Sequence, residues 1–227
     1  MPSTHPLRYV PNMTSTTDGM GSRTPIYLIA AHPRWRDSTV NRRLLAAARE
    51  TANVDVNDLY DSYPDYAIDA EAERARVERA DLLVLLHPIQ WYSMPPLQKL
   101  WLDEVLRYGW AYGAGGDALR GKDLWLVAST GGPEASYHPQ GYNRYFFDAF
   151  LPPYEQTAAL CGMRFLPPLV LHGASRVPAA ELQAHVDTFS QRLASYPDWP
   201  EIDDLDPSPA CVVPVQDRPP ITGGEVP

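Results

Sequence analysis

The chain has 227 residues, 44% of them hydrophobic, and a formal net charge of −9. That length predicts one sizeable α/β domain with extensions. The acidic balance gives no indication of the basic surface that nucleic-acid binding needs, and no apolar run reaches the roughly 18–20 residues of a membrane span. Two isolated cysteines, Cys161 and Cys211, make neither a disulfide framework nor a zinc site, so we expect no metal centre and a cytoplasmic location.

Composition divides the chain into three parts. Residues 1–24 are rich in Ser, Thr, Pro and Gly without a hydrophobic period, which is typical of a flexible extension. Residues 25–196 carry the apolar periodicity of a folded domain. Residues 197–227 are dense in prolines and acids, and this composition cannot form a core of its own.

Predicted strands alternate with predicted helices in the central part. Strands are expected at 25–31, 54–59, 82–86, 122–128 and 165–172. Helices are expected from Ser38, over 67–80, after Pro95, over 143–160 and over 178–194. Prolines inside 165–172 place that strand at a sheet edge. This order predicts a flavodoxin-like, doubly wound parallel sheet of five strands, ordered 2-1-3-4-5, with helices on both faces.

Three loops are expected to converge where the first, third and fourth strands end, because these strands are neighbours in that order. The first loop offers His32 and then Ser38, Thr39, Val40 and Asn41 at a helix start. Helix N–H groups and small hydroxyls suit a phosphate. Ser38 by itself is more simply explained as an ordinary N-cap.

The second loop, Ile89-Gln90-Trp91-Tyr92, offers rings that can lie along a planar ligand or pack against a helix or a partner subunit. In the third loop, Ser129-Thr130-Gly131-Gly132, the paired glycines either let the backbone approach a ligand closely or form an ordinary turn. Together the three loops favour a phosphorylated flavin. No GxGxxG follows the first strand, and the GxxxxGK[ST] and GxSxG motifs are absent from the sequence.

Longer motifs give the chain a specific resemblance. It resembles the flavodoxin-like NAD(P)H–quinone oxidoreductases and, among them, the ancillary proteins of Kef glutathione-gated potassium efflux systems, over residues 26–193. The segments that carry the resemblance are AHP…STVN at 31–41, HPIQWYSMPPLQKLWLDEVLRYGWAYG at 87–113, GDALRGK at 116–122, STGG at 129–132 and LPP at 166–168.

The resemblance implies a function and partners. It implies FMN as bound cofactor, NAD(P)H as electron donor and a quinone as acceptor, in ping-pong two-electron chemistry. It implies a homodimer, and FMN contacts at His32, 38–41, 89–92 and 129–132. The alternative is a regulatory subunit of a Kef-type transporter at the inner face of the cell membrane, with a structural or sensory flavin.

The proton donor is a separate question. Related vertebrate quinone reductases have a tyrosine five residues after the second glycine of TGG, and Tyr137 has that spacing. Their histidine six residues further on is Asn143 here, and His138 is a possible substitute, although an exposed loop histidine is the simpler explanation. His87 and His172 are interpreted as hydrogen-bonded core residues.

Overall fold

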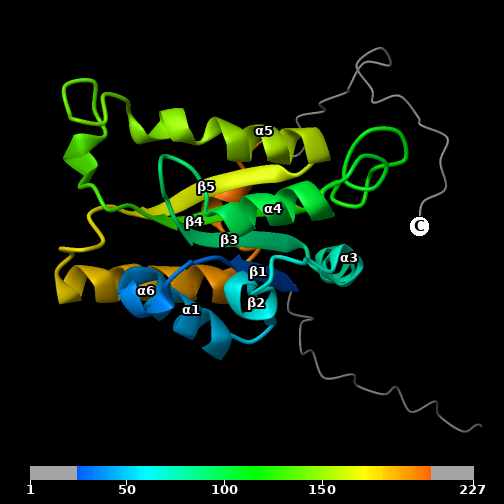
Figure 1. Cartoon of the computed structure of the whole chain (residues 1–227), viewed down its shortest axis with the longest axis horizontal. Helices are drawn as coiled ribbons and strands as arrows, with labels where there is room; N and C mark the ends of the chain where they lie inside the picture. The colour runs from blue at the N-terminus through cyan, green and yellow to red at the C-terminus, as the bar shows by residue number, and fades with distance from the viewer. Residues whose placement is uncertain (1–24, 206–227) are drawn as a thin grey trace, which may run out of the picture.

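The computed structural model describes residues 25–205 (Figure 1). The segment 1–24 and residues 206–227 of the expected acidic tail lie outside the described residues. Five strands form one parallel sheet in the order β2-β1-β3-β4-β5, which confirms the predicted topology. The strands are β1 (Ile26–Ala30), β2 (Val54–Asp58), β3 (Leu82–Pro88), β4 (Asp123–Ser129) and β5 (Arg164–Leu171).

Helices cover both faces of this sheet. Figure 1 shows α1 (Val40–Glu50) and α6 (Ala179–Ser195) on one side, with α4 (Pro96–Val105) and α5 (Pro152–Cys161) on the other. Helix α3 (Ala70–Arg79) packs beside α4, and the short α2 (Leu59–Ser62) follows β2. Every residue of β1 and β4 is buried because each lies inside the sheet between two helical layers.

Strand β5 lies at the sheet edge, as its prolines predict, and its pairing with β4 is irregular at those prolines. Trp125 pairs with Leu166, but Val127 pairs with Leu169, so two prolines of β5 lie opposite one residue of β4. Proline has no N–H for the ladder, and a bulge accommodates the two residues at the edge.

A buried carboxylate joins α3 and α4 to the sheet. Glu73 is only 1% exposed. Trp101 on α4 donates its indole N–H to Glu73 Oε2 at 2.6 Å, and Tyr63 donates its hydroxyl to Oε1 at 2.7 Å. The Tyr27 hydroxyl and the Asn57 amide donate to the same carboxylate. The network fixes α4, which follows the aromatic loop after β3.

Two expected segments differ from the structure. The helix expected over 143–160 is wrong in its first half, where a short 3-10 helix, η3 (Phe147–Phe150), precedes α5. Pro152 and Pro153 explain the later start, because proline is compatible with the first helical turn and not with the interior. Beyond residue 196 the chain still packs on the fold, since Trp199 and Ile202 of the η4 region (Pro200–Ile202) are buried against α6 and β4.

Candidate functional site

A cavity of about 290 Å³ lies where β1, β3 and β4 end. The structure brings all three predicted loops to it. The predicted residues that line it are His32, Ser38, Thr39, Val40, Asn41, Ile89, Gln90, Ser129, Thr130 and Gly131. Trp91, Tyr92 and Gly132 do not line it, although Trp91 directly follows the lining residue Gln90 and Gly132 directly follows Gly131. Sequence reasoning missed four lining residues, Asp37, Pro88, Ala174 and Ser175. The last two follow β5, and a strand beside β4 delivers its loop to the same edge.

The start of α1 has no side-chain cap. Ser38 is not the N-cap, contrary to the simple explanation of that residue. It ends the 3-10 turn η1 (Trp35–Asp37), and its N–H donates to Trp35 O at 3.0 Å. Thr39 precedes the helix and makes no capping bond through its side chain. The first-turn N–H groups of α1 therefore remain available to an anionic group in the cavity.

His32 contributes an imidazole to the same cavity. Its Nδ1 accepts the backbone N–H of Arg34 at 3.1 Å. Burial lowers the pKa of the ring below its usual value, so the ring is neutral at pH 7. In that state Nε2 carries the proton, and His32 is a hydrogen-bond donor.

Ser129 connects the first two loops to the third. Its hydroxyl accepts the side-chain amide of Asn41 at 2.9 Å, and its carbonyl accepts the N–H of Ile89 at 2.8 Å. Both Asn41 and Ser129 are buried. The other amide atom, Asn41 Oδ1, is buried without a partner within residues 25–205, so an acceptor at the cavity is left unsatisfied.

The aromatic loop is a strained turn. Gln90 and Ser93 exchange backbone hydrogen bonds of 2.8 and 3.1 Å around Trp91 and Tyr92. These two residues have φ values of 48° and 65°, the left-handed region that costs a non-glycine residue about 1–2 kcal/mol. Observed strain of this kind clusters at functional sites, because the surrounding structure has to hold it.

The glycines of the third loop have different surroundings. A Cβ on Gly132 would lie 2.6 Å from Oη of the exposed Tyr142 and 2.8 Å from Oγ of the buried Ser136, so both side chains would have to move. A Cβ on Gly131 would meet nothing within 4 Å. Gly131 lines the cavity, and the open space above it is therefore available to a ligand.

Tyr137 and His138, the predicted proton donors, have different environments. The half-buried Tyr137 packs against Phe147 at 5.4 Å and Phe150 at 6.0 Å, and its ring lies 5.2 Å from that of His172. Burial raises the pKa of Tyr137, which keeps its phenol protonated at neutral pH. His138 is exposed, and its Nδ1 accepts the N–H of Gln140 at 3.2 Å. Of the two, Tyr137 lies nearer the cavity, because its ring contacts that of His172, which in turn hydrogen-bonds the cavity residue Thr130.

His172 is not a core residue, contrary to the interpretation of the sequence. It follows β5 and is half-buried, with Nδ1 3.0 Å from Thr130 Oγ1. Its ring lies 5.2 Å from that of Tyr137 and 5.1 Å from that of Phe147. His87, by contrast, is fully buried, as expected.

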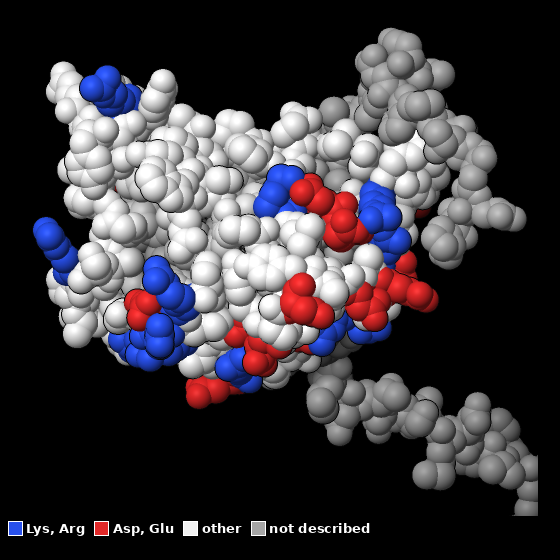
Figure 2. All heavy atoms as spheres, in the orientation of Figure 1, with Lys and Arg blue, Asp and Glu red and all other residues white. Residues whose placement is uncertain are grey.

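Exposed aromatic side chains form a rim beside the cavity. Figure 2 shows that charged groups gather over the lower half of this face, whereas the upper part, over α5 and the loop after β4, has few of them. Tyr92 connects the two segments of the rim, because it stacks on Phe150 at 5.2 Å and donates to Asn143 Oδ1 at 3.4 Å. The members of this aromatic rim are Trp91, Tyr92, Tyr142, Tyr145 and Phe146.

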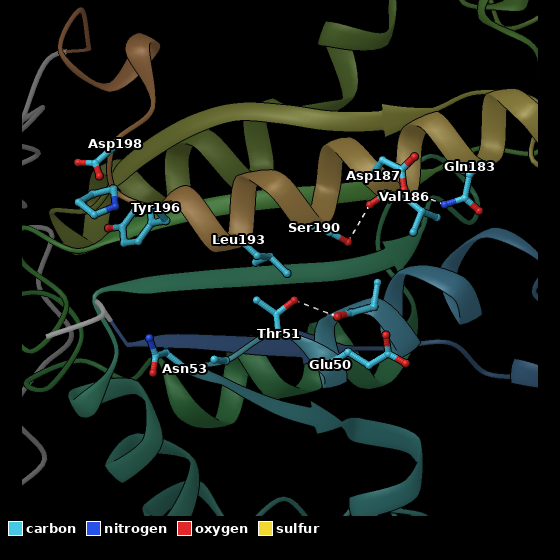
Figure 3. Close-up of a pocket in the computed structure, with 14 residues that line it drawn as sticks. Glu50, Thr51, Asn53, Gln183, Val186, Asp187, Ser190, Leu193, Tyr196 and Asp198 are labelled. Atoms are coloured by element: carbon cyan, nitrogen blue, oxygen red, sulfur yellow. Dashed lines mark hydrogen bonds between the residues drawn. The ribbon is translucent and has the colours of Figure 1, made fainter. Parts of the chain in front are cut away.

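A larger groove, of about 840 Å³, lies between α1 and α6 (Figure 3). None of the predicted site residues lines it. Its walls include three carboxylates, those of Glu50, Asp187 and Asp198, whereas Asp37 supplies the single carboxylate of the smaller cavity, so the groove is the less favourable place for an anionic phosphate. In the part of the chain that the structure describes, no helix is long and apolar enough to cross a membrane.

Known proteins share both the sequence and the fold. A family model described as the flavodoxin-like fold matches residues 24–193. The glutathione-regulated potassium-efflux system ancillary protein KefF of Citrobacter koseri is 43% identical over 171 residues, which cover 75% of this chain and 96% of that protein.

Two solved structures are similar over almost their whole length. General stress protein 14 of Treponema denticola, in complex with FMN, is 38% identical with a TM-score of 0.71, and the match covers 74% of this chain and 97% of that one. An NADPH-quinone reductase from P. pentosaceus is 26% identical with a TM-score of 0.69, covering 76% and 99%. The chain belongs to the flavodoxin-like family that includes the KefF ancillary proteins and NAD(P)H–quinone reductases.

Proposed function

We propose that this protein is an FMN-dependent NAD(P)H:quinone oxidoreductase. The observation that carries the proposal is the cavity at the ends of β1, β3 and β4, where an uncapped helix start, a strained aromatic turn and an open glycine meet. The similar protein solved with FMN supports the choice of cofactor.

The residues present fit FMN. The N–H groups at the start of α1 and the hydroxyls of Ser38 and Thr39 suit its phosphate. The unpartnered Asn41 Oδ1 is an acceptor for a cofactor hydroxyl, and the space above Gly131 leaves room for a flat ring. Bound there, FMN supplies two-electron transfer from a nicotinamide to a quinone.

The side chains then have two tasks, to exclude water and to supply a proton. We assign proton donation to the quinone oxygen to Tyr137, because its raised pKa keeps it protonated and its ring packs on His172, which hydrogen-bonds the cavity residue Thr130. The aromatic rim supplies flat apolar surface for a quinone. A homodimer that covers part of this rim completes the proposal, since an exposed aromatic cluster of this kind suits a partner.

The test uses the purified full-length chain. We expect bound flavin by absorbance and oxidation of NADH or NADPH that depends on added quinone. Tyr137→Phe is expected to slow quinone turnover at least roughly tenfold with flavin retained, whereas His138→Ala has a smaller effect. A colourless protein that added FMN neither binds nor stabilises would refute the proposal.

A second candidate function is regulation of a Kef-type transporter. It is favoured by the 43% identity to KefF over 96% of that protein. The test compares potassium efflux from vesicles that contain such a transporter, with and without this protein, using both the wild type and Tyr137→Phe. Efflux that responds equally to both proteins supports regulation, and no response in a preparation that reduces quinones supports a free-standing enzyme.

A further inference from the structure

We infer that Phe150 is a positioning residue that makes the acceptor site selective for quinones with fused aromatic rings. The inference rests on the proposed function and names the class of acceptor. Phe150 is the last residue of η3, in the segment that joins β4 to α5, and its side chain is half-buried.

Phe150 is the centre of a group of aromatic rings beside the cavity. Tyr92 stacks on it at 5.2 Å with an interplanar angle of 22°. Tyr137 meets it edge-on at 6.0 Å, and Tyr145 does so at 6.3 Å. Phe147 lies at 6.4 Å. These are the arrangements that aromatic pairs favour, so one side chain fixes rings from the loop after β3 and from the segment after β4.

The group adjoins the cavity in two places. Tyr92 lies two residues after Gln90, which lines the cavity. On the other side, the ring of Tyr137 lies 5.2 Å from that of His172, whose Nδ1 is 3.0 Å from Oγ1 of the lining residue Thr130. An acceptor at the open side of the cavity would therefore meet these rings.

Backbone pairing fixes the second of these places. Beyond the ends of β4 and β5, Thr130 N donates to Leu171 O at 2.9 Å and Gly173 N donates to Gly132 O at 2.8 Å. These bonds continue the pairing of the two strands on either side of His172. The side of the cavity that carries the imidazole is thus part of the sheet framework.

Tyr92 is held although its side chain is 49% exposed. Besides the stack on Phe150, its hydroxyl donates to Asn143 Oδ1 at 3.4 Å. Asn143 is itself anchored, because its Nδ2 donates to Oγ of the buried Ser136 at 2.9 Å. A ring that is ordered before the ligand arrives loses little further freedom on binding, which favours affinity.

The extent of the group favours acceptors with more than one ring. Each ring of an acceptor gains from a stacked or edge-on aromatic contact. A quinone with a single ring has only that ring to offer, whereas two fused rings reach further across the group and remain flat. Removal of Phe150 frees Tyr92 and Tyr137 at once, and the advantage of the second ring should then be lost.

The test compares menadione, which has two fused rings, with duroquinone, which has one ring and a similar number of carbon atoms. We expect the wild-type holoenzyme to have a KM for menadione at least roughly fivefold below that for duroquinone. Phe150→Leu should remove this preference by raising the menadione KM, while kcat and FMN affinity are retained. Tyr92→Leu, which removes the stacked ring itself, should lose the preference in the same way.

Two further variants separate positioning from a general effect on the fold. Phe150→Tyr keeps a ring at the centre of the group and should keep the preference. Phe165→Leu is the matched control, because this half-buried phenylalanine near the start of β5 lies at the opposite edge of the sheet from the cavity. It should leave both KM values at the wild-type level.

A second readout does not depend on turnover. An NMR titration of the flavin-free protein with menadione should show weaker binding in Phe150→Leu than in the wild type and in Phe165→Leu. Unaltered menadione preference in Phe150→Leu would overturn the inference, as would equal losses for the two quinones. An inactive wild type would instead overturn the proposed function, while the titration would still decide whether Phe150 shapes a site for fused rings.

Discussion

The side-chain amide of Asn41 donates to Ser129 Oγ at 2.9 Å, between residues that are 88 positions apart in the chain. The bond joins the start of α1 to the end of β4 underneath the cavity. Asn41 is thus both a wall of the cavity and a connection between two of its loops. Its loss should affect the fold and the ligand together.

The first prediction concerns this pair. Asn41→Ala should lower the free energy of unfolding of the flavin-free protein by about 1–2 kcal/mol, because it removes a buried hydrogen bond. It should also weaken FMN binding. Ser129→Ala leaves Asn41 Nδ2 buried without its partner and should cost a similar amount. Urea unfolding of both variants and of the double variant gives the coupling energy, and additive effects would mean that the bond contributes nothing.

The second prediction uses the two glycines. Gly131→Val should leave the unfolding free energy of the flavin-free protein nearly unchanged, because its Cβ meets nothing within 4 Å, but should reduce FMN affinity at least roughly tenfold. Gly132→Ala should destabilise the fold itself, since its Cβ would lie 2.8 Å from Oγ of the buried Ser136. FMN titration by fluorescence and thermal unfolding separate the two effects. Unchanged affinity in Gly131→Val would remove the third loop from the flavin site.

The third prediction concerns strain in the aromatic turn. Trp91 is 92% exposed at φ 48°, so Trp91→Gly loses little packing and gains backbone freedom. We expect this variant to be more stable than the wild type by about 1 kcal/mol without flavin, and to bind FMN more weakly. Trp91→Phe keeps a side chain at that φ and is the control, with wild-type stability. A destabilised Trp91→Gly would show that the turn carries no strain.

The fourth prediction concerns the buried carboxylate. Glu73→Gln replaces one acceptor oxygen by an amide that faces donors from Trp101, Tyr27, Tyr63 and Asn57. The free energy of unfolding should fall by about 3 kcal/mol, as for other disrupted buried networks. Glu71→Gln, exposed on the same helix, should change it by less than about 0.5 kcal/mol. Similar values for the two variants would contradict the network.

The fifth prediction concerns pH. Burial lowers the pKa of His87 from 6.5 to about 4, and its ring stacks on that of Tyr154. The folded state therefore binds fewer protons than the unfolded state, and the stabilisation present above pH 6.5 is lost as the pH falls towards 4.

Comparison with His87→Gln isolates this histidine from the other titrating groups. Between about pH 7.5 and about pH 4, the wild type should lose roughly 3 kcal/mol more unfolding free energy than the variant. Urea unfolding of the flavin-free proteins at several pH values measures the difference. Parallel curves for the two proteins would mean that His87 keeps its ordinary pKa in the fold.

Much of the fold could be predicted because each element has a local signal. The apolar run before His87 identifies β3 as a buried strand, and the paired prolines identify β5 as an edge strand. Because the connections between parallel strands follow strict rules, few orders of the five strands in the sheet remain possible. The convergence of the three loops follows from that order alone. By contrast, the start of α5 was placed too early, because residues 143–151 have no strong breaker until Pro152.

The relation between His172 and Thr130 could not be predicted. It depends on the register of β4 and β5, including the bulge at Pro167 and Pro168, and a shift of one residue would turn the imidazole to the other face. The strain at Trp91 and Tyr92 is equally hidden, since neither residue type indicates a positive φ. Such features come from tertiary structure and not from local propensity.

The pairing that continues past β4 and β5 has a consequence for divergence within the family. It anchors Thr130 and Gly132 to the framework by bonds in which the segment between Gly132 and Pro152 takes no part. Under the proposed function, exchange of this segment, which carries Tyr137, would change the acceptors that are reduced while the anchored backbone stays in place. A graft of the corresponding segment from a relative is the natural way to transfer substrate preference onto an unchanged flavin scaffold.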